Sequence, residues 1–90
     1  MKPIRWTPHA ARKCAQREID RVEAELAIAQ PESVTPAHPR HQFRQRRFLD
    51  KTLNAKMLLR VLVEETDLEF VVVTLYKTSK FKKYEPGSSE

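Results

Sequence analysis

Residues 57–77 have the sequence MLLRVLVEETDLEFVVVTLYK, in which two apolar runs flank a short polar segment. Runs of branched and aromatic side chains of this length are typical of β-strands. We therefore predict strands at Met57–Glu65 and Phe70–Lys77. The four residues between these strands favour an antiparallel connection.

Both strands are apolar on two faces, because side chains alternate along a strand. In the first strand, Leu59, Val61 and Val63 share one face and Arg60 lies on the other. Two short helices cannot cover both faces of a sheet, so we expect the second face to contact a partner chain or a long tail. In the second strand, strict alternation places one set of residues on one face and the remaining residues on the other face. The first set is Val71, Val73 and Leu75, and the second is Phe70, Val72, Thr74 and Tyr76.

Further strands are predicted on both sides of this region. Gln42–Leu49 mixes arginines with apolar residues, which suits an edge strand or one with an exposed face. Lys2–Trp6 could add a short edge strand at the start of the chain. Pro31–His41 contains three prolines and no apolar periodicity, so we expect an extended connection there.

Two helices are predicted before that connection. Thr7 is a preferred N-cap residue, and Pro8 suits the first helical position because its missing amide would have no partner there. In the first helix, the small side chains Ala10 and Cys14 recur at helical spacing and permit close packing.

The second helix begins with a capping-box pattern. Asp20 is expected to accept a hydrogen bond from the third helical amide, and Glu23 to reach back. Pro31 ends the helix, so residues 8–30 form most simply a helical hairpin with a break near Glu18. One uninterrupted helix is the alternative. The expected apolar stripe of the second helix consists of Ile19, Val22, Leu26 and Ala29.

These elements predict an α+β fold, with an N-terminal helical hairpin packed on one face of a three- to four-stranded antiparallel sheet. The chain has 90 residues, which is enough for one domain. We place that domain at residues 1–85 and expect a flexible C-terminal tail at residues 86–90.

The composition excludes several classes of protein. A single glycine argues against glycine-rich phosphate loops, which need several residues without a Cβ atom. The one cysteine, Cys14, cannot form an internal disulfide, and no signal-peptide pattern precedes it. No apolar run approaches the ~20 residues of a membrane-spanning helix. We therefore expect a cytoplasmic protein that does not span a membrane.

Metal and nucleophilic sites are also not expected. The three histidines are His9, His38 and His41, and together with Cys14 they lack the spacing of a zinc site. Cys14 falls on the small-residue face of the first helix, where a buried thiol is unreactive. We predict no metal and no cofactor.

Positive charge is concentrated in two segments. The chain carries 17 Lys and Arg against 12 Asp and Glu, a net charge of +5. Residues 40–60 contain seven basic residues and one acid, and residues 77–83 contain four lysines and no acid. Such a distribution favours a polyanionic partner such as RNA. A solvated basic surface without a partner is the alternative.

Cleavage of RNA by its own 2′-hydroxyl needs a proton acceptor, cations that stabilise the phosphorane-like transition state, and a proton donor. His9 is the candidate for proton transfer, and Arg60, Lys77 and Lys80 are the candidates for binding phosphate. Aromatic residues between the lysines could stack on bases. Arg60 could instead pair across strands with an acid such as Glu69. Residues expected to contact nucleic acid are Lys13, Arg17, Arg44, Arg46, Lys82, Lys83 and Tyr84.

Several motifs together resemble an uncharacterised family of small bacterial domains related to the RelE and BrnT-like toxins of type II toxin-antitoxin systems. Two residues depart from the family pattern, since Lys13 replaces a commoner arginine and Glu18 replaces a preferred glycine. The matching segments are Thr7-Pro8-His9-Ala10, Lys13-Cys14, Arg17, Ile19, Val22, Leu59-Arg60-Val61, Glu64 and residues 71–80.

This resemblance implies two helices on a twisted antiparallel sheet, metal-independent cleavage of mRNA, and inhibition by a cognate antitoxin protein. A dimer is compatible with the pattern. The alternative, from a different functional class, is a non-catalytic interaction module that recruits another protein through an exposed sheet face or edge.

Overall fold

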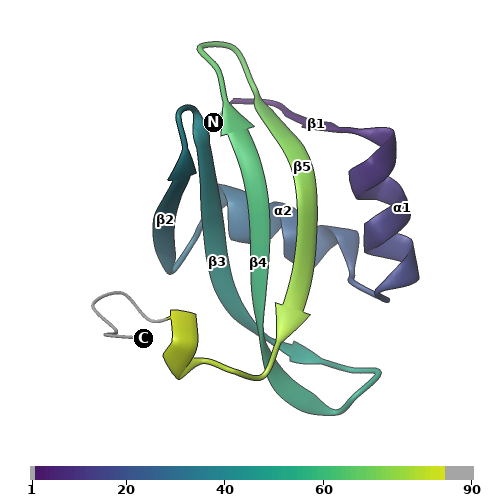
Figure 1. Cartoon of the computed structure of the whole chain (residues 1–90). Coiled ribbons are helices and arrows are strands. Elements are labelled where there is room, and N and C mark those ends of the chain that lie inside the picture. Colours follow the sequence, from purple (N-terminus) through teal and green to yellow (C-terminus); the bar gives the residue numbers. More distant parts are fainter. Residues whose placement is uncertain (1, 85–90) are drawn as a thin grey trace.

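The computed structural model describes residues 2–84 and has the α+β architecture predicted from the sequence, with two helices and one sheet (Figure 1). The elements in chain order are β1 (Ile4–Trp6), α1 (Pro8–Gln16), α2 (Arg21–Ala29), β2 (Ser33–His38), β3 (His41–Asp50), β4 (Ala55–Glu65), β5 (Phe70–Thr78) and a single 3-10 turn, η1 (Lys82–Tyr84).

The sheet has five strands in the order β1-β5-β4-β3-β2. Strands β2 to β5 form an antiparallel meander, whereas β1 pairs in parallel with β5 through residues 4–6. The prediction of a purely antiparallel sheet with three or four strands was therefore wrong in detail. The extra strand is β2, which lies within the segment expected to be an extended connection, and Pro36 is tolerated because β2 is at the sheet edge.

The helical hairpin is confirmed, including its break. Glu18 has a φ of 53°, a left-handed conformation that cannot continue a helix. Thr7 caps α1 by accepting a hydrogen bond from the amide of Ala10. Asp20 caps α2, but it accepts from the amide of Val22, the second helical residue, and not from the third as predicted.

The apolar stripe predicted for α2 was wrong in part. Ile19 is buried in the core as expected, but Val22 is 65% exposed, and the fully buried residues of the helix are Ala24, Ala27 and Ile28. The small side chains of Ala24 and Ala27 let α2 pack closely on β3 and β4.

The core lies between the helices and one face of the sheet. Leu59, Val61 and Val63 of β4 face the helices, as predicted. In β5 the alternation is interrupted, because a bulge at Val73 lets Leu75 join the core with Val72. The predicted grouping of Leu75 with Val73 was wrong because an extra residue in a bulge reverses the facing of the residues that follow it.

The second face of the sheet is covered in part by the end of the same chain. Tyr84 of η1 lies against Tyr76 of β5, with ring centroids 6.4 Å apart. The sequence analysis expected either a partner chain or a long tail to contact this face. In the structure, a short C-terminal segment of the same chain contacts part of it. Figure 1 shows this segment in yellow, folded back toward the lower end of β3. The predicted flexible tail at residues 86–90 lies outside the described residues.

Candidate functional site

Arg60 is the centre of a polar and aromatic cluster on the sheet face opposite the helices. The antiparallel register places Gln45, Arg60 and Tyr76 side by side on β3, β4 and β5. Arg60 is only 7% exposed, and its Nε donates a hydrogen bond to Oε1 of Gln45 while Nη1 donates to the hydroxyl of Tyr76. The expected alternative partner, Glu69, instead binds Arg5.

Two aromatic rings enclose the Arg60 guanidinium. Its Cζ lies 3.9 Å from the ring centroid of Phe43 and 4.0 Å from that of Tyr84. Contacts of this kind hold an arginine through attraction between the cation and the ring faces. In the following paragraphs, the Arg60 cluster means Phe43, Gln45, Arg60, Tyr76 and Tyr84.

One edge of the guanidinium is left for a ligand. Within residues 2–84, Nη2 of Arg60 takes part in no hydrogen bond, and no buried side-chain nitrogen or oxygen lacks a partner. Nη2 is therefore not fully enclosed. An arginine that is fixed by its neighbours and keeps an N–H group without a partner is suited to bind a phosphate or carboxylate oxygen.

The two tyrosines of the cluster have pKa values that shift in opposite directions. Burial and the hydrogen bond with Tyr84 raise the pKa of Tyr76. The hydrogen bond from Tyr76, followed by the positive charges of Lys83 and Arg60, lowers the pKa of Tyr84. Arg60 donates a hydrogen bond to Tyr76, whose ring lies edge-on to that of Tyr84. A lowered pKa favours the phenolate form of Tyr84 relative to a free tyrosine, which makes Tyr84 the candidate proton acceptor of the cluster.

Lys77 lies on the opposite sheet face from Arg60. Its ammonium forms an ion pair with Asp50, a buried residue, and donates to the backbone carbonyl of Glu18 at 3.1 Å. The Lys77 side chain is 13% exposed. Lys77 thus joins the sheet to the helical turn, and its charge is neutralised by a carboxylate.

Arg44 and Arg46 also point to the helix side. Nε of Arg44 donates to the carbonyl of Ile28 at 2.7 Å, and Nη1 of Arg46 donates to the carbonyl of Gln30 at 2.9 Å. These carbonyls belong to the C-terminal end of α2, where cations are favourable. Both arginines therefore act as caps of α2 in the structure.

The predicted residues of α1 are separate from the Arg60 cluster. His9 is exposed at the start of α1, while Lys13 is half-buried. Arg17 follows the helix, and its Nη1 donates to the carbonyl of Leu75 at 2.6 Å. The helix packs on the sheet face opposite Arg60, so the structure does not bring His9 and Arg60 together.

The lysines after β5 lie on the same segment as Tyr84. Lys80, Lys82 and Lys83 are exposed, and Nζ of Lys83 is 5.5 Å from the Tyr84 ring. Of the eleven residues predicted for the site, these lysines, Tyr84 and Arg60 are the ones that the fold associates with the open sheet face. The expected single cradle formed from α1 and the strands is not found.

Sequence reasoning did not include Phe43 and Gln45 in the site. Gln45 is 1% exposed and also donates to the hydroxyl of Ser33 at 2.7 Å. Neither residue type is charged, so neither contributes to a basic pattern. The signal that could have identified Gln45 is the strand register, which pairs it with Arg60.

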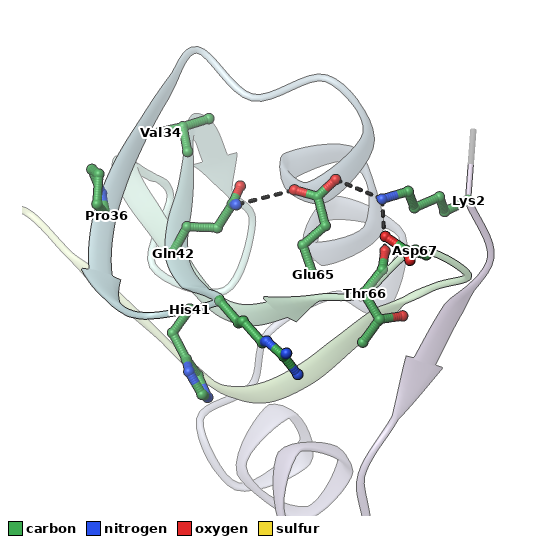
Figure 2. Close-up of a pocket in the computed structure, with 9 residues that line it drawn as sticks. Lys2, Val34, Pro36, His41, Gln42, Glu65, Thr66 and Asp67 are labelled. Carbon is green, nitrogen blue, oxygen red and sulfur yellow. Dashed lines mark hydrogen bonds and ion pairs between the residues drawn. The ribbon is translucent and has the colours of Figure 1, made fainter.

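A separate pocket of about 470 Å³ lies at the other end of the sheet (Figure 2). Its wall contains Lys2, which forms an ion pair with Glu65 at 2.8 Å, and Gln42, which donates to the same carboxylate at 3.2 Å. Figure 2 shows the side chains of Lys2 and Gln42 converging on Glu65. None of the residues predicted for the site lines this pocket.

Metal and thiol chemistry find no support in the described part of the chain. Among the described side chains, which leave out that of His38, no group of three or more His, Cys, Asp or Glu is placed to hold a metal ion. Cys14 is buried, and burial raises the pKa of its thiol.

None of the helices formed by the described residues has the length and apolarity required to cross a lipid bilayer.

Comparison with known proteins identifies a family without an assigned activity. No curated protein and no solved structure matches the chain. A family model described as a domain of unknown function, DUF4258, matches residues 6–77, which include both helices, strands β2 to β4, β5 except Thr78, and only Trp6 of β1. The chain therefore belongs to the DUF4258 family.

Proposed function

We propose that this DUF4258 domain is a toxin of the RelE and BrnT-like kind that cleaves RNA without a metal, with the Arg60 cluster as its active site. The proposed activity is the one expected from the sequence, but some residues have different roles. Proton transfer is assigned to Tyr84 in place of His9. Arg60 binds the scissile phosphate, Tyr84 transfers the proton, and Lys80, Lys82 and Lys83 bind neighbouring phosphates. A cognate antitoxin, a dimer and a cytoplasmic location are further expectations of this proposal.

The proposed reaction is attack by the 2′-hydroxyl of the RNA on the adjacent phosphorus. The Tyr84 phenolate accepts the 2′-hydroxyl proton while the 2′-oxygen forms a bond to phosphorus and the bond to the 5′-oxygen breaks. Nη2 of Arg60 and the nearby ammonium groups stabilise the negative charge on the non-bridging oxygens. The lysine ammonium groups are available donors for the departing 5′-oxygen. The products are a 2′,3′-cyclic phosphate and a 5′-hydroxyl.

One observation carries this proposal, which is the packing of the Tyr84 ring on the guanidinium of Arg60, itself held by a hydrogen bond to Tyr76. A tyrosine of ordinary pKa is a poor base at neutral pH, because almost all of it is protonated. The contact with Tyr76, followed by the charges of Lys83 and Arg60, lowers the pKa of Tyr84, which is the direction that the reaction needs. Arg60 also keeps one nitrogen, Nη2, without a hydrogen-bond partner among the described residues.

The test is RNA cleavage by purified protein, with and without ribosomes and in the presence of EDTA. We expect products that end in 2′,3′-cyclic phosphates. Tyr84→Phe removes the proton acceptor and keeps the ring on Arg60, so cleavage should fall by roughly 10²- to 10⁴-fold while the fold is retained. His9→Ala is the matched comparison, because His9 lies on the opposite layer, and it should retain activity. Activity lost in His9→Ala and retained in Tyr84→Phe would refute this assignment.

A non-catalytic interaction module is the second candidate. The observation that favours it is that several predicted cations are engaged within the domain, as Lys77 is by Asp50 and Arg44 is by Ile28. Bacterial growth on induction separates the two functions. Growth arrest that Tyr84→Phe relieves, at equal soluble expression, supports the toxin. Normal growth of cells with abundant folded protein supports the interaction module.

A further inference from the structure

The exposed side of α1 carries positive charge that nothing in the described chain neutralises. Residues 1–17 include five Lys and Arg and no acidic residue. The two cations in or beside β1 are paired, because Lys2 binds Glu65 and Arg5 binds Glu69. In contrast, within residues 2–84 no carboxylate lies at ion-pair distance from the three cations that follow, which are Arg12, Lys13 and Arg17.

These cations follow one another along α1 and its C-terminal cap. Ala10 and Cys14 are buried on the inner side of α1, whereas Arg12 is exposed. Lys13 is half-buried, and Arg17 is the C-cap residue, four positions and about one helical turn beyond Lys13. The α1 basic face is defined as Arg12, Lys13 and Arg17. With nine residues, α1 is about 13 Å long, enough to face two or more consecutive phosphates of a nucleic acid.

The α1 basic face meets β5 at the end from which the C-terminal lysines continue. Arg17 donates to the carbonyl of Leu75, and Lys77 donates to the carbonyl of Glu18. The strand ends at Thr78 and Lys80 follows directly. The hydrogen bond of Arg17 is to a neutral carbonyl, so it orients the guanidinium without removing its charge. Positive side chains therefore extend from α1, across the end of β5, to the segment that carries Tyr84.

We propose that the α1 basic face is a second RNA-binding surface, which holds the single-stranded RNA on one side of the strand β5 while the Arg60 cluster cleaves it on the other. This inference rests on the proposed function, because it takes the same RNA as its ligand. It assigns a different role to α1, which contributes affinity through phosphate contacts and takes no part in the chemical step. Phosphate contacts add binding energy irrespective of base sequence.

The experiment measures binding of a short, fluorescein-labelled 2′-O-methyl RNA, which cannot be cleaved, by anisotropy over a range of salt concentrations. The test variant is Arg12→Gln/Lys13→Gln. The matched control is Lys51→Gln/Lys56→Gln, which removes the same charge from two exposed residues of the β3–β4 connection and the start of β4. Because the net charge changes equally, a difference between the variants reports local contacts.

Each phosphate contact to a single strand contributes about 0.7 to the slope of log affinity against log salt concentration. We therefore expect the Arg12→Gln/Lys13→Gln variant, which removes two cations, to lower this slope by about 1.4. Its affinity at about 0.1 M salt should fall roughly 20-fold. The control should change affinity less than 3-fold. Equal losses in the two variants would overturn the inference and leave the proposed cleavage intact. Wild-type protein that binds polyglutamate and not RNA would overturn both in favour of an acidic protein partner.

Cleavage rates distinguish a role of α1 in RNA binding from a role in the chemical step. If α1 only binds, saturating RNA should restore the cleavage rate of Arg12→Gln/Lys13→Gln to within about 3-fold of wild type, because the loss is in substrate binding. Tyr84→Phe should show the reverse pattern, with normal affinity and a low rate at saturation. A low saturated rate in the α1 variant, with retained fold, would contradict the division of roles.

Discussion

Replacing Arg60 by methionine is expected to destabilise the domain strongly. Arg60 is 7% exposed and donates to Gln45, a residue that is 1% exposed. Methionine fills part of the volume between the two rings but cannot donate a hydrogen bond. Oε1 of Gln45 then loses its charged donor inside the sheet face, at a cost of about 1–3 kcal/mol. The lost contacts with Phe43 and Tyr84 contribute about 1–2 kcal/mol more.

The expected total for Arg60→Met is a loss of about 3 kcal/mol in the free energy of unfolding. A domain of this size has a urea dependence of roughly 1–1.5 kcal/mol per molar, so the urea midpoint should fall by about 2–3 M. Circular dichroism at increasing urea concentrations measures this shift. The result matters for function, because loss of toxicity in an Arg60 variant is informative only where the protein remains folded.

A double-mutant cycle tests the cause of this loss. Gln45→Leu alone removes the acceptor of Arg60 Nε, whereas Arg60→Met/Gln45→Leu replaces both partners by apolar side chains, which costs less than the sum of the two single changes. We expect a coupling free energy of about 1.5 kcal/mol between the two positions. Additive effects, or a loss below about 1 kcal/mol for Arg60→Met, would refute the arrangement of the cluster.

Three further predictions follow from other contacts. Glu18→Gly should raise the free energy of unfolding by about 1 kcal/mol, measured as a melting temperature about 4–8 °C higher, because glycine adopts the left-handed φ of 53° without steric cost. Arg44→Met should lower stability by about 2 kcal/mol in urea denaturation, because the carbonyl of Ile28 loses its charged donor at a helix C-terminus. Lys77→Met should lower stability most at neutral pH. The hydrogen bond from Lys77 lowers the pKa of Asp50, so the contribution of the pair is complete above the ordinary value of 3.8 and is lost as the pH falls through the lower pKa of the folded state. Urea midpoints of wild type and Lys77→Met should therefore converge at acidic pH, and a constant difference across this range would contradict the ion pair.

The secondary structure could be predicted where a local signal determined it. Thr7 and Pro8 marked the start of α1, and branched residues at alternating positions marked β4. These signals depend on neighbouring residues alone. The bulge at Val73 was not predictable in this way, because it is defined by the pairing of β5 with β4 and has no distinctive residue type.

The candidate site was predictable only in part for a related reason. Arg60 and Tyr84 were identified from their residue types, yet Arg60 owes its environment to Gln45 and Tyr76 on neighbouring strands. That environment follows from strand register, which sequence periodicity does not supply without a known turn. The parallel strand β1 is similarly a product of long-range pairing with residues about 66 positions later, as in Ile4 with Phe70.

The distribution of charge shows which part of a basic sequence is available for a polyanion. Residues 40–60 have the highest local excess of basic residues, but four of the seven, Arg44, Arg46, Arg47 and Arg60, form hydrogen bonds with other parts of the domain. The segments without acids behave differently. The cations of α1 and the lysines after β5 form no ion pair within the described chain, and all except Lys13 are exposed, with Arg17 and Lys83 making only neutral contacts. Local density of Lys and Arg therefore overestimates the binding surface, because arginine is also the residue that caps helices and stacks on aromatic rings inside a small domain. A better criterion is positive charge on an exposed helix face or chain end that forms no ion pair among the described residues, and in this chain that criterion selects the α1 basic face together with Lys80, Lys82 and Lys83.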